Sequence, residues 1–113
     1  MSRLPASLEA GSLVRRAEAD GDFAAILRKG DPDRGALLLV VTSRGGHVAF
    51  LERVLSLESG DYGWQRTGPG NNSGSAEIAD FLAKRTRFDD DLWLIELDIA
   101  DPERFIAETI SEG

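Results

Sequence analysis

The sequence has 113 residues, 42% of them hydrophobic and none of them cysteine, which suits one domain with one core and excludes disulfides and thiolate sites. Its 20 acidic and 13 basic residues give a net charge of −7, which opposes non-specific binding to nucleic acid and to anionic membranes. The chain start lacks a signal-peptide pattern, and the longest apolar run, Ala36 to Val41, is far shorter than the roughly 20 residues of a membrane span. We therefore expect a single cytoplasmic domain over residues 1–113, with neither nucleic acid nor membrane as a partner.

The hydrophobic periodicity predicts three helices and five strands in one α+β domain. Apolar runs bounded by turn-forming residues indicate the strands, and i, i+3, i+4 spacing indicates the helices. In chain order we expect an extended lead-in over residues 1–10, a helix over 11–20, strands over 23–29, 36–41, 48–57 and 62–67, a flexible loop over 68–75, a helix over 76–89, a strand over 92–99 and a last helix from Asp101. The order is α-β-β-β-β-α-β-α, with a mostly antiparallel meander sheet and the helices packed on one face.

Several element ends carry local signals. Residues 44–47 contain a Gly-Gly pair between two β-prone runs, which indicates a hairpin. Ser75 is expected to cap the helix that starts at Ala76. Asp101 is expected to cap the last helix, with Pro102 at the first helical position, where proline is favoured.

The central strands are expected to be apolar on both faces. Residues 36–41 are apolar throughout, and residues 48–57 place large apolar side chains on both sides, as in strands that are buried on both faces of a sheet. Three helices, two of them short, are expected to cover one face well and hardly two. Either the sheet curls over its own second face or a second copy covers it. We expect a homodimer through the sheet, because a symmetric dimer is the commonest soluble assembly.

The loop between the first two strands is a candidate anion-binding site. Arg28, Lys29 and Arg34 flank a glycine-rich turn whose backbone amides could point at an anion. Arg15 and Arg16 of the first helix would join this site if the helix packs beside the loop. The alternative is a solvated hairpin loop, with the two helical arginines stabilising the C-terminal end of their own helix.

The strand over residues 92–99 carries a second group of candidates. Glu96 and Asp98 lie two positions apart, so strand geometry places their carboxylates on one face about 7 Å apart. Two carboxylates at that separation could divide the roles of acid and base. Trp93 is a further candidate binding residue. The alternative is a solvated outer face of the sheet.

No complete catalytic or cofactor motif occurs in the sequence. The glycine-rich segment 68–75 lacks both phosphate-binding patterns. The single histidine, His47, has no serine in a recognised nucleophile motif, and residues 89–91, three aspartates, do not match a calcium loop. We therefore expect no cofactor and no metal site, and we interpret the chain as a small non-enzymatic accessory or protein-interaction domain.

The alternative function is a small hydrolase or a domain that binds phosphorylated metabolites. It would use the loop from Arg28 to Arg34 as an anion clamp, with Glu96 and Asp98 beside it. A concave pocket joining this loop to Trp93 and Glu96 would favour the alternative. A flat apolar patch would favour the interaction domain.

Three blocks of sequence resemble one bacterial family. They read LVRRAEADGDFAAILRKGDPDRGALLLV, RFDDDLWLIELDI and DPERFIAE. Their order and spacing, with the Arg15-Arg16 pair, Phe23, and the Asp91-Leu92-Trp93 run ahead of Glu96, resemble the family called domain of unknown function 1491. The resemblance spans most of the chain except residues 56–75. It implies no activity, cofactor or catalytic residue.

Overall fold

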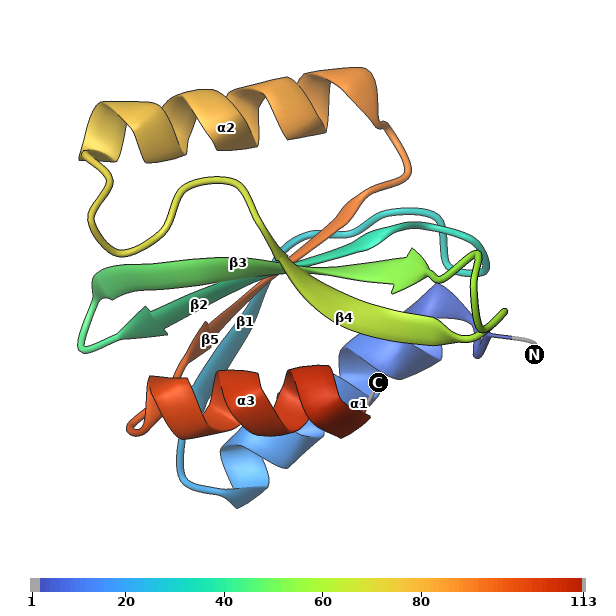
Figure 1. Cartoon of the computed structure of the whole chain (residues 1–113), viewed down its shortest axis with the longest axis horizontal. Coiled ribbons are helices and arrows are strands. Elements are labelled where there is room, and N and C mark those ends of the chain that lie inside the picture. Colours follow the sequence, from blue (N-terminus) through green and yellow to red (C-terminus); the bar gives the residue numbers. More distant parts are fainter. Residues whose placement is uncertain (1–2, 113) are drawn as a thin grey trace.

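The computed structural model describes residues 3–112 and contains three helices around one five-stranded sheet (Figure 1). The α+β class and the order α-β-β-β-β-α-β-α are confirmed. The strand ends lie within two residues of their expected positions. The elements are α1 (Ala6–Ala19), β1 (Phe23–Arg28), β2 (Leu37–Ser43), β3 (Gly46–Leu55), β4 (Tyr62–Thr67), α2 (Ser75–Phe88), β5 (Trp93–Asp98) and α3 (Pro102–Glu112).

The sheet is mostly antiparallel, with the strand order β1-β5-β2-β3-β4. Strands β2, β3 and β4 form the expected meander, and β5 pairs with β1 antiparallel and with β2 parallel. The sequence pattern indicated a meander of the first four strands, and this is wrong for β1, because the chain returns after α2 and inserts β5 between β1 and β2. This insertion makes β5 and β2 the centre of the sheet.

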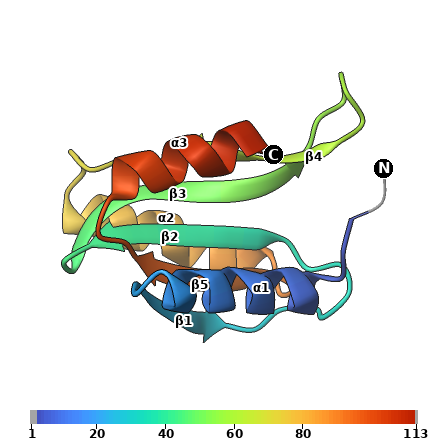
Figure 2. The ribbon, with the colours of Figure 1, turned by 90° about the horizontal axis from the view of Figure 1, so that it is seen from below.

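The helices cover both faces of the sheet, so the expectation that they pack on one face is wrong. Figure 1 shows α2 on one side and α1 with α3 on the other. Seen from the α1 and α3 side, α1 lies over β1 and β5, whereas α3 lies over β3 and β4 (Figure 2). The side chains at Leu38, Val40 and Phe50 pack toward Phe81 and Leu82 of α2. The opposite face forms the larger part of the core.

Covering both faces explains why β2 is apolar throughout. Its residues Leu37 to Thr42 are all buried, alternating between the two halves of the core. The expected homodimer was based on a second face left open, and α2 closes that face. The dimer itself stays a prediction, and it needs a different surface.

The first helix starts five residues before its expected start at residue 11, so the expected extended lead-in is wrong for residues 6–10. Residues 1 and 2 of that lead-in lie outside the described residues. α1 begins at Ala6, directly after Pro5, and its first amides are capped by a distant loop. The N–H of Ala6 donates to the carbonyl of Asp33 at 3.1 Å, and the N–H of Ser7 donates to the carbonyl of Pro32 at 2.9 Å. These two bonds satisfy amides that every helix start leaves unpaired.

Of the other two helix starts, that of α2 differs from its expectation and that of α3 agrees with it. Ser75 lies inside α2 rather than before it, and the N-cap is Gly74, which offers no side-chain bond. Asp101 precedes α3 as expected, with Pro102 at the first helical position, and Oδ1 of Asp101 accepts the N–H of Arg104 at 3.4 Å. Within residues 3–112, no helix combines the length and the apolar character that a membrane span requires.

The segment over residues 68–75 contacts His47 and Phe81. Nε2 of His47 lies 2.9 Å from the carbonyl oxygen of Pro69, and the ring of His47 lies 4.6 Å from that of Phe50. Gly68 has a φ of 63° and sits against the ring of Phe81. His47 is therefore half-buried rather than solvated. The flexibility of the segment stays a prediction.

Candidate functional site

The guanidinium of Arg28 donates hydrogen bonds to the backbone just before β5. Its Nη1 donates to the carbonyl oxygens of Asp89 and Leu92, both at 2.9 Å, and its Nη2 donates to that of Asp90 at 3.3 Å. A guanidinium suits this task because its donors form a fixed planar fork. Arg28 therefore closes the chain between α2 and β5, and its guanidinium does not point at solvent as an anion clamp requires.

Asp31 and Trp93 continue the same internal network. The indole N–H of Trp93 donates to the carbonyl of Asp31 at 2.7 Å, and the N–H of Asp31 donates to the carbonyl of Asp91 at 3.1 Å. Oδ1 of Asp31 accepts the amides of Arg34 and Asp33, at 2.9 and 2.8 Å. These amides, that of Arg34 first, lower the pKa of Asp31. The loop is thus a structural junction that joins β1, β5 and the start of α1.

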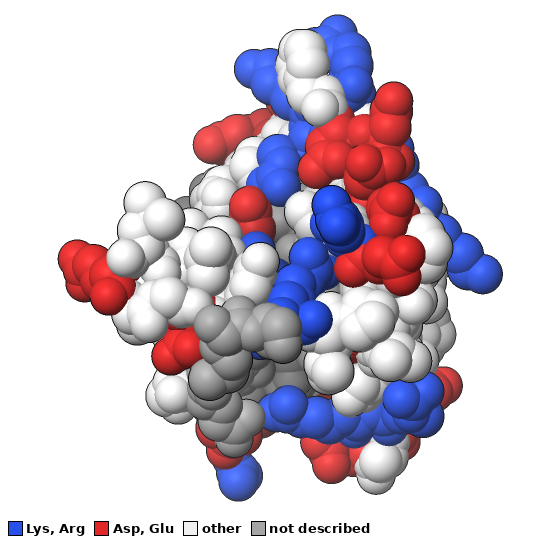
Figure 3. All heavy atoms as spheres, turned by 90° about the vertical axis from the view of Figure 1, so that its right-hand side faces the viewer, with Lys and Arg blue, Asp and Glu red and all other residues white. Residues whose placement is uncertain are grey.

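The remaining bases of the candidate anion site are dispersed over the surface. Lys29 and Arg34 are exposed on the loop, and Arg15 is exposed on α1. The end of the molecule where this loop and the segment before β5 lie carries acidic and basic side chains side by side (Figure 3). A patch of mixed sign does not concentrate the potential that attracts a phosphate or a nucleic acid.

The candidates on β5 point to opposite faces of the sheet. Trp93 belongs to the core under α1 and α3, whereas Glu96 follows Leu94 on the face that α2 covers. Glu96 is half-buried, and its Oε2 accepts the hydroxyl of Thr42 at 3.3 Å. The interpretation of this face as a solvated outer surface is therefore wrong, and Trp93 and Glu96 do not line one pocket.

Asp98 holds the turn between β2 and β3. Its two carboxylate oxygens accept the amides of Arg44 and Gly45, each at 3.0 Å. Both turn residues have positive φ, 53° and 80°, as in the type I′ turn that matches the twist of a hairpin. These contacts, that of Gly45 first and those of Arg44 and Thr42 after it, lower the pKa of Asp98 against the opposing effect of desolvation.

The lowered pKa of Asp98 predicts a loss of stability in acid. An aspartate has a pKa of about 3.9 in an unfolded chain, so the contribution is complete above that value and disappears as the pH falls through the lower pKa of the folded state. We expect Asp98→Asn to lower the melting temperature at pH 7 and to reduce the fall of the melting temperature between pH 5 and pH 2.5. The pKa of Asp31 is also lowered, so the contribution of Asp31 to the fall should remain in the variant. Thermal unfolding across this range measures both. An equal fall in the variant would contradict the assignment.

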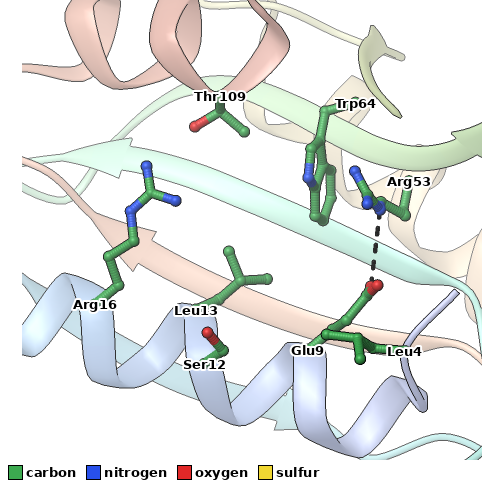
Figure 4. Close-up of a pocket in the computed structure, with 8 residues that line it drawn as sticks. All are labelled: Leu4, Glu9, Ser12, Leu13, Arg16, Arg53, Trp64 and Thr109. Atoms are coloured by element: carbon green, nitrogen blue, oxygen red, sulfur yellow. Dashed lines mark ion pairs between the residues drawn. The ribbon is translucent and has the colours of Figure 1, made fainter. Parts of the chain in front are cut away.

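A groove of about 250 Å³ lies between α1 and α3 on the sheet face that these helices share. We call it the α1–α3 groove. Figure 4 shows side chains from both helices and from the sheet converging on it. They include Glu9, Leu13 and Arg16 of α1, Arg53 of β3, Trp64 of β4 and Thr109 of α3.

Charge and orphaned polar groups distinguish this groove. Nε of Arg53 lies 3.8 Å from Oε2 of Glu9, and its guanidinium lies 5.4 Å from the centre of the Trp64 ring. The hydroxyl of Thr109 is buried without a hydrogen-bond partner among the described residues, and Thr109 is only 5% exposed. Of the eight candidate residues from the sequence, Arg16 alone lines the groove. The sequence analysis missed the other residues that line the groove. An arginine inside the apolar run 48–57 was a signal that could have pointed to Arg53.

The second prominent surface is the outer edge of β1. This strand pairs with β5 alone, so its other side carries unpaired backbone groups. Phe23 is 59% exposed and Leu27 is 52% exposed, and Ile26 between them is also exposed. No charged residue or proline interrupts the stretch from Phe23 to Leu27, where a bulge before Arg28 is the one irregularity of the pairing. An open apolar edge of this kind favours pairing with another strand.

Comparison with known proteins gives the family. The model described as "Protein of unknown function (DUF1491)" matches residues 4–107. The chain belongs to this family. The resemblance carried by the three sequence blocks is thereby confirmed. No curated protein matches the chain.

Solved structures of similar proteins, two of them described as DUF1491 family proteins, share the fold. A crystal structure of a DUF1491 family protein from Caulobacter crescentus CB15 has 25% identity and a TM-score of 0.76, covering 88% of this chain and 92% of that one. An NMR structure of such a protein from the same organism has 25% identity and a TM-score of 0.73, covering 90% and 91%. The solution structure of protein Atu0922 from A. tumefaciens has 26% identity and a TM-score of 0.72, covering 88% and 89%. The family therefore has bacterial members with this α+β fold.

Proposed function

We propose that this DUF1491 protein is a non-enzymatic interaction module whose β1 edge pairs with another strand, in the first place with β1 of a second copy. The observation that carries the proposal is the open edge with Phe23, Ile26 and Leu27 exposed. Strand addition supplies backbone hydrogen bonds along such an edge, and the exposed apolar side chains add buried area.

The charges that flank β1 favour self-pairing in one direction. Asp20 and Asp22 precede the strand, whereas Arg28 ends it and Lys29 follows it. Two copies that pair antiparallel bring the acidic end of one strand beside the basic end of the other, and a parallel pair would align like charges. An antiparallel pair has the two-fold symmetry of most soluble dimers and would join two five-stranded sheets into one.

The internal contacts of the alternative site also support a non-enzymatic role. Arg28 is engaged by three backbone carbonyls, and Asp98 by two backbone amides. A hydrolase or a phosphorylated-metabolite site built on Arg28, Glu96 and Asp98 would have to break these contacts. The opposite edge, β4, is less suited to pairing because Arg66 there reaches Glu103 of α3 at 3.5 Å.

Sedimentation equilibrium tests the proposal through paired variants. We expect the wild-type protein to pass from monomer to dimer as its concentration rises to hundreds of micromolar. The double change Phe23→Lys with Leu27→Lys should keep it monomeric, because two desolvated charges per edge oppose pairing. The control Leu57→Lys alters a residue that is 95% exposed between β3 and β4 and should dimerise as the wild type does. A wild-type monomer at every concentration, or a double variant that still dimerises, would refute the proposal.

A further inference from the structure

We propose that α2, together with residues 68–74 before it, is a lid that opens as a unit while the rest of the domain stays folded. Figure 1 shows α2 alone on its side of the sheet, with one connection to β4 and one to β5. The structure describes all 14 residues of α2, and none of them is fully buried. The side chains beneath the helix, among them Leu38 and Phe50, are fully buried. The helix therefore covers an apolar face of the sheet without being enclosed itself.

The attachment of α2 to the sheet is light. Its apolar contacts with the sheet come from Ile78, Phe81 and Leu82, and Arg85 adds an ion pair with Glu52 of β3. The N-cap of the helix is a glycine, which has no side chain to accept an amide hydrogen bond. Elements with few buried apolar contacts open at a lower free energy than the whole domain. By this measure α2 is the element that opens first.

The length of α2 determines what the opened state looks like. The helix has 14 residues, and isolated helices below about 12–15 residues are marginal in water. Once α2 leaves the sheet it should therefore lose its helical hydrogen bonds together. Opening uncovers the apolar sheet face and also exposes the amides of the helix to exchange with solvent.

The C-terminal end of α2 is the fixed hinge of the lid. The guanidinium of Arg28 donates to three carbonyl oxygens within residues 89–92, the connection from α2 to β5. This connection belongs to the network that joins β1 and β5, so it stays in place when the helix opens. The freedom to move therefore lies at the other end of α2.

The N-terminal end of α2 carries the latch. Nε2 of His47 lies 2.9 Å from the carbonyl oxygen of Pro69, and this contact ties the segment before α2 to β3. The ring of Phe81 lies 4.7 Å from that of Phe50 in β3. A Cβ added at Gly68 would lie 2.6 Å from the ring of Phe81. The segment and the helix thus meet at one side chain of α2, and both should be released together.

Native-state hydrogen exchange at low micromolar concentration tests the lid. At this concentration we expect β1 to be unpaired, so the result does not depend on the proposed self-association. The amides of residues 79–88 should share one opening and exchange at least about tenfold faster than those of β2, relative to their rates in an unfolded chain. Equal protection of α2 and β2 would overturn the proposal. Protection that declines steadily from the middle of α2 to its ends would show fraying and would also overturn it.

Two glycine variants separate opening of the lid from unfolding of the whole domain. Gly68 and Gly21 have positive φ, 63° and 83°, so alanine strains the backbone at either position. A Cβ at Gly68 also meets Phe81, whereas a Cβ at Gly21, after α1 on the other side of the sheet, meets no atom within 4 Å. The strain at Gly68 is released when the lid opens, and the strain at Gly21 only when the whole domain unfolds.

The two variants should therefore give different exchange patterns. Gly68→Ala should accelerate exchange in α2 and in β2 alike, by about tenfold or more. Gly21→Ala should accelerate β2 about fivefold and leave α2 at its wild-type rate. Acceleration of α2 in Gly21→Ala would mean that α2 opens only with the whole domain. Wild-type exchange of α2 in Gly68→Ala would mean that the contact with Phe81 does not hold the lid closed, and either result would refute the proposal.

Discussion

Replacing Gly30 by alanine is expected to destabilise the protein by about 3 kcal/mol or more, because the backbone before β5 occupies the space that a side chain needs. A Cβ at Gly30 would overlap the carbonyl oxygen of Asp91 and lie 2.6 Å from its carbonyl carbon. The obstacle is backbone, held in place by Arg28, so it has little freedom to move away. Chemical denaturation measures the loss.

A matched glycine provides the control for this change. A Cβ at Gly70 meets no atom within 4 Å, so Gly70→Ala should change the free energy of unfolding by less than about 0.5 kcal/mol. Similar stabilities for the two variants would mean that the loop after β1 does not lie against the segment before β5 as described.

Replacing Arg28 by methionine is the second large effect, with an expected loss of about 3 kcal/mol. The change removes charge-assisted hydrogen bonds to the carbonyls of Asp89, Asp90 and Leu92 and leaves these carbonyls without their donor. Arg28→Lys should recover little of the loss, because one ammonium group does not reproduce the planar fork. Urea denaturation of the three proteins tests the order of stability.

The neighbouring Arg34 separates a structural role from an anion-binding role. Its side chain is exposed, so Arg34→Met should leave stability within about 0.5 kcal/mol of the wild type. Inorganic phosphate should stabilise neither the wild type nor this variant, because ligand linkage requires a site. A rise in melting temperature with phosphate that disappears in Arg34→Met would restore the anion-clamp hypothesis.

Most elements of the fold could be predicted because their signals are local. Alternating apolar residues identified β5 and the face of it that carries Trp93, and an unbroken apolar run identified β2, which is buried on both faces. The Asp101-Pro102 pair identified the start of α3. Each of these signals lies within a few residues of the feature that it predicts.

The parts that were mispredicted depend on contacts between distant segments. α1 starts at Ala6 because the carbonyls of Pro32 and Asp33 cap it, and nothing near residue 6 in the sequence indicates them. α2 covers the second face although no residue of this helix, all of which the structure describes, is fully buried. The apolar stripe of Ile78, Phe81 and Leu82 predicted the helix, but it did not indicate against which face of the sheet the helix packs.

The candidate groove was predictable only in part, for the same reason. Arg16 was singled out as a base of α1, but Arg53, Trp64 and Thr109, which line the groove with it, come from β3, β4 and α3, far along the chain. Thr109 is an ordinary helical threonine in the sequence, and only the tertiary structure buries its hydroxyl. The loop of Arg28 was conspicuous in the sequence because its charges are dense, yet these residues chiefly hold the backbone together.

Hydrogen exchange at the backbone amides of β1 tests the proposed role of its edge most directly. Half of the amides of an edge strand point away from its neighbour, so those of residues 23–28 that face outward should exchange rapidly at low micromolar concentration. At hundreds of micromolar the same amides should become protected, while exchange in the turn at residues 56–61 stays unchanged. Exchange in β1 that is independent of concentration would contradict the account, and so would protection that appears on β4 instead.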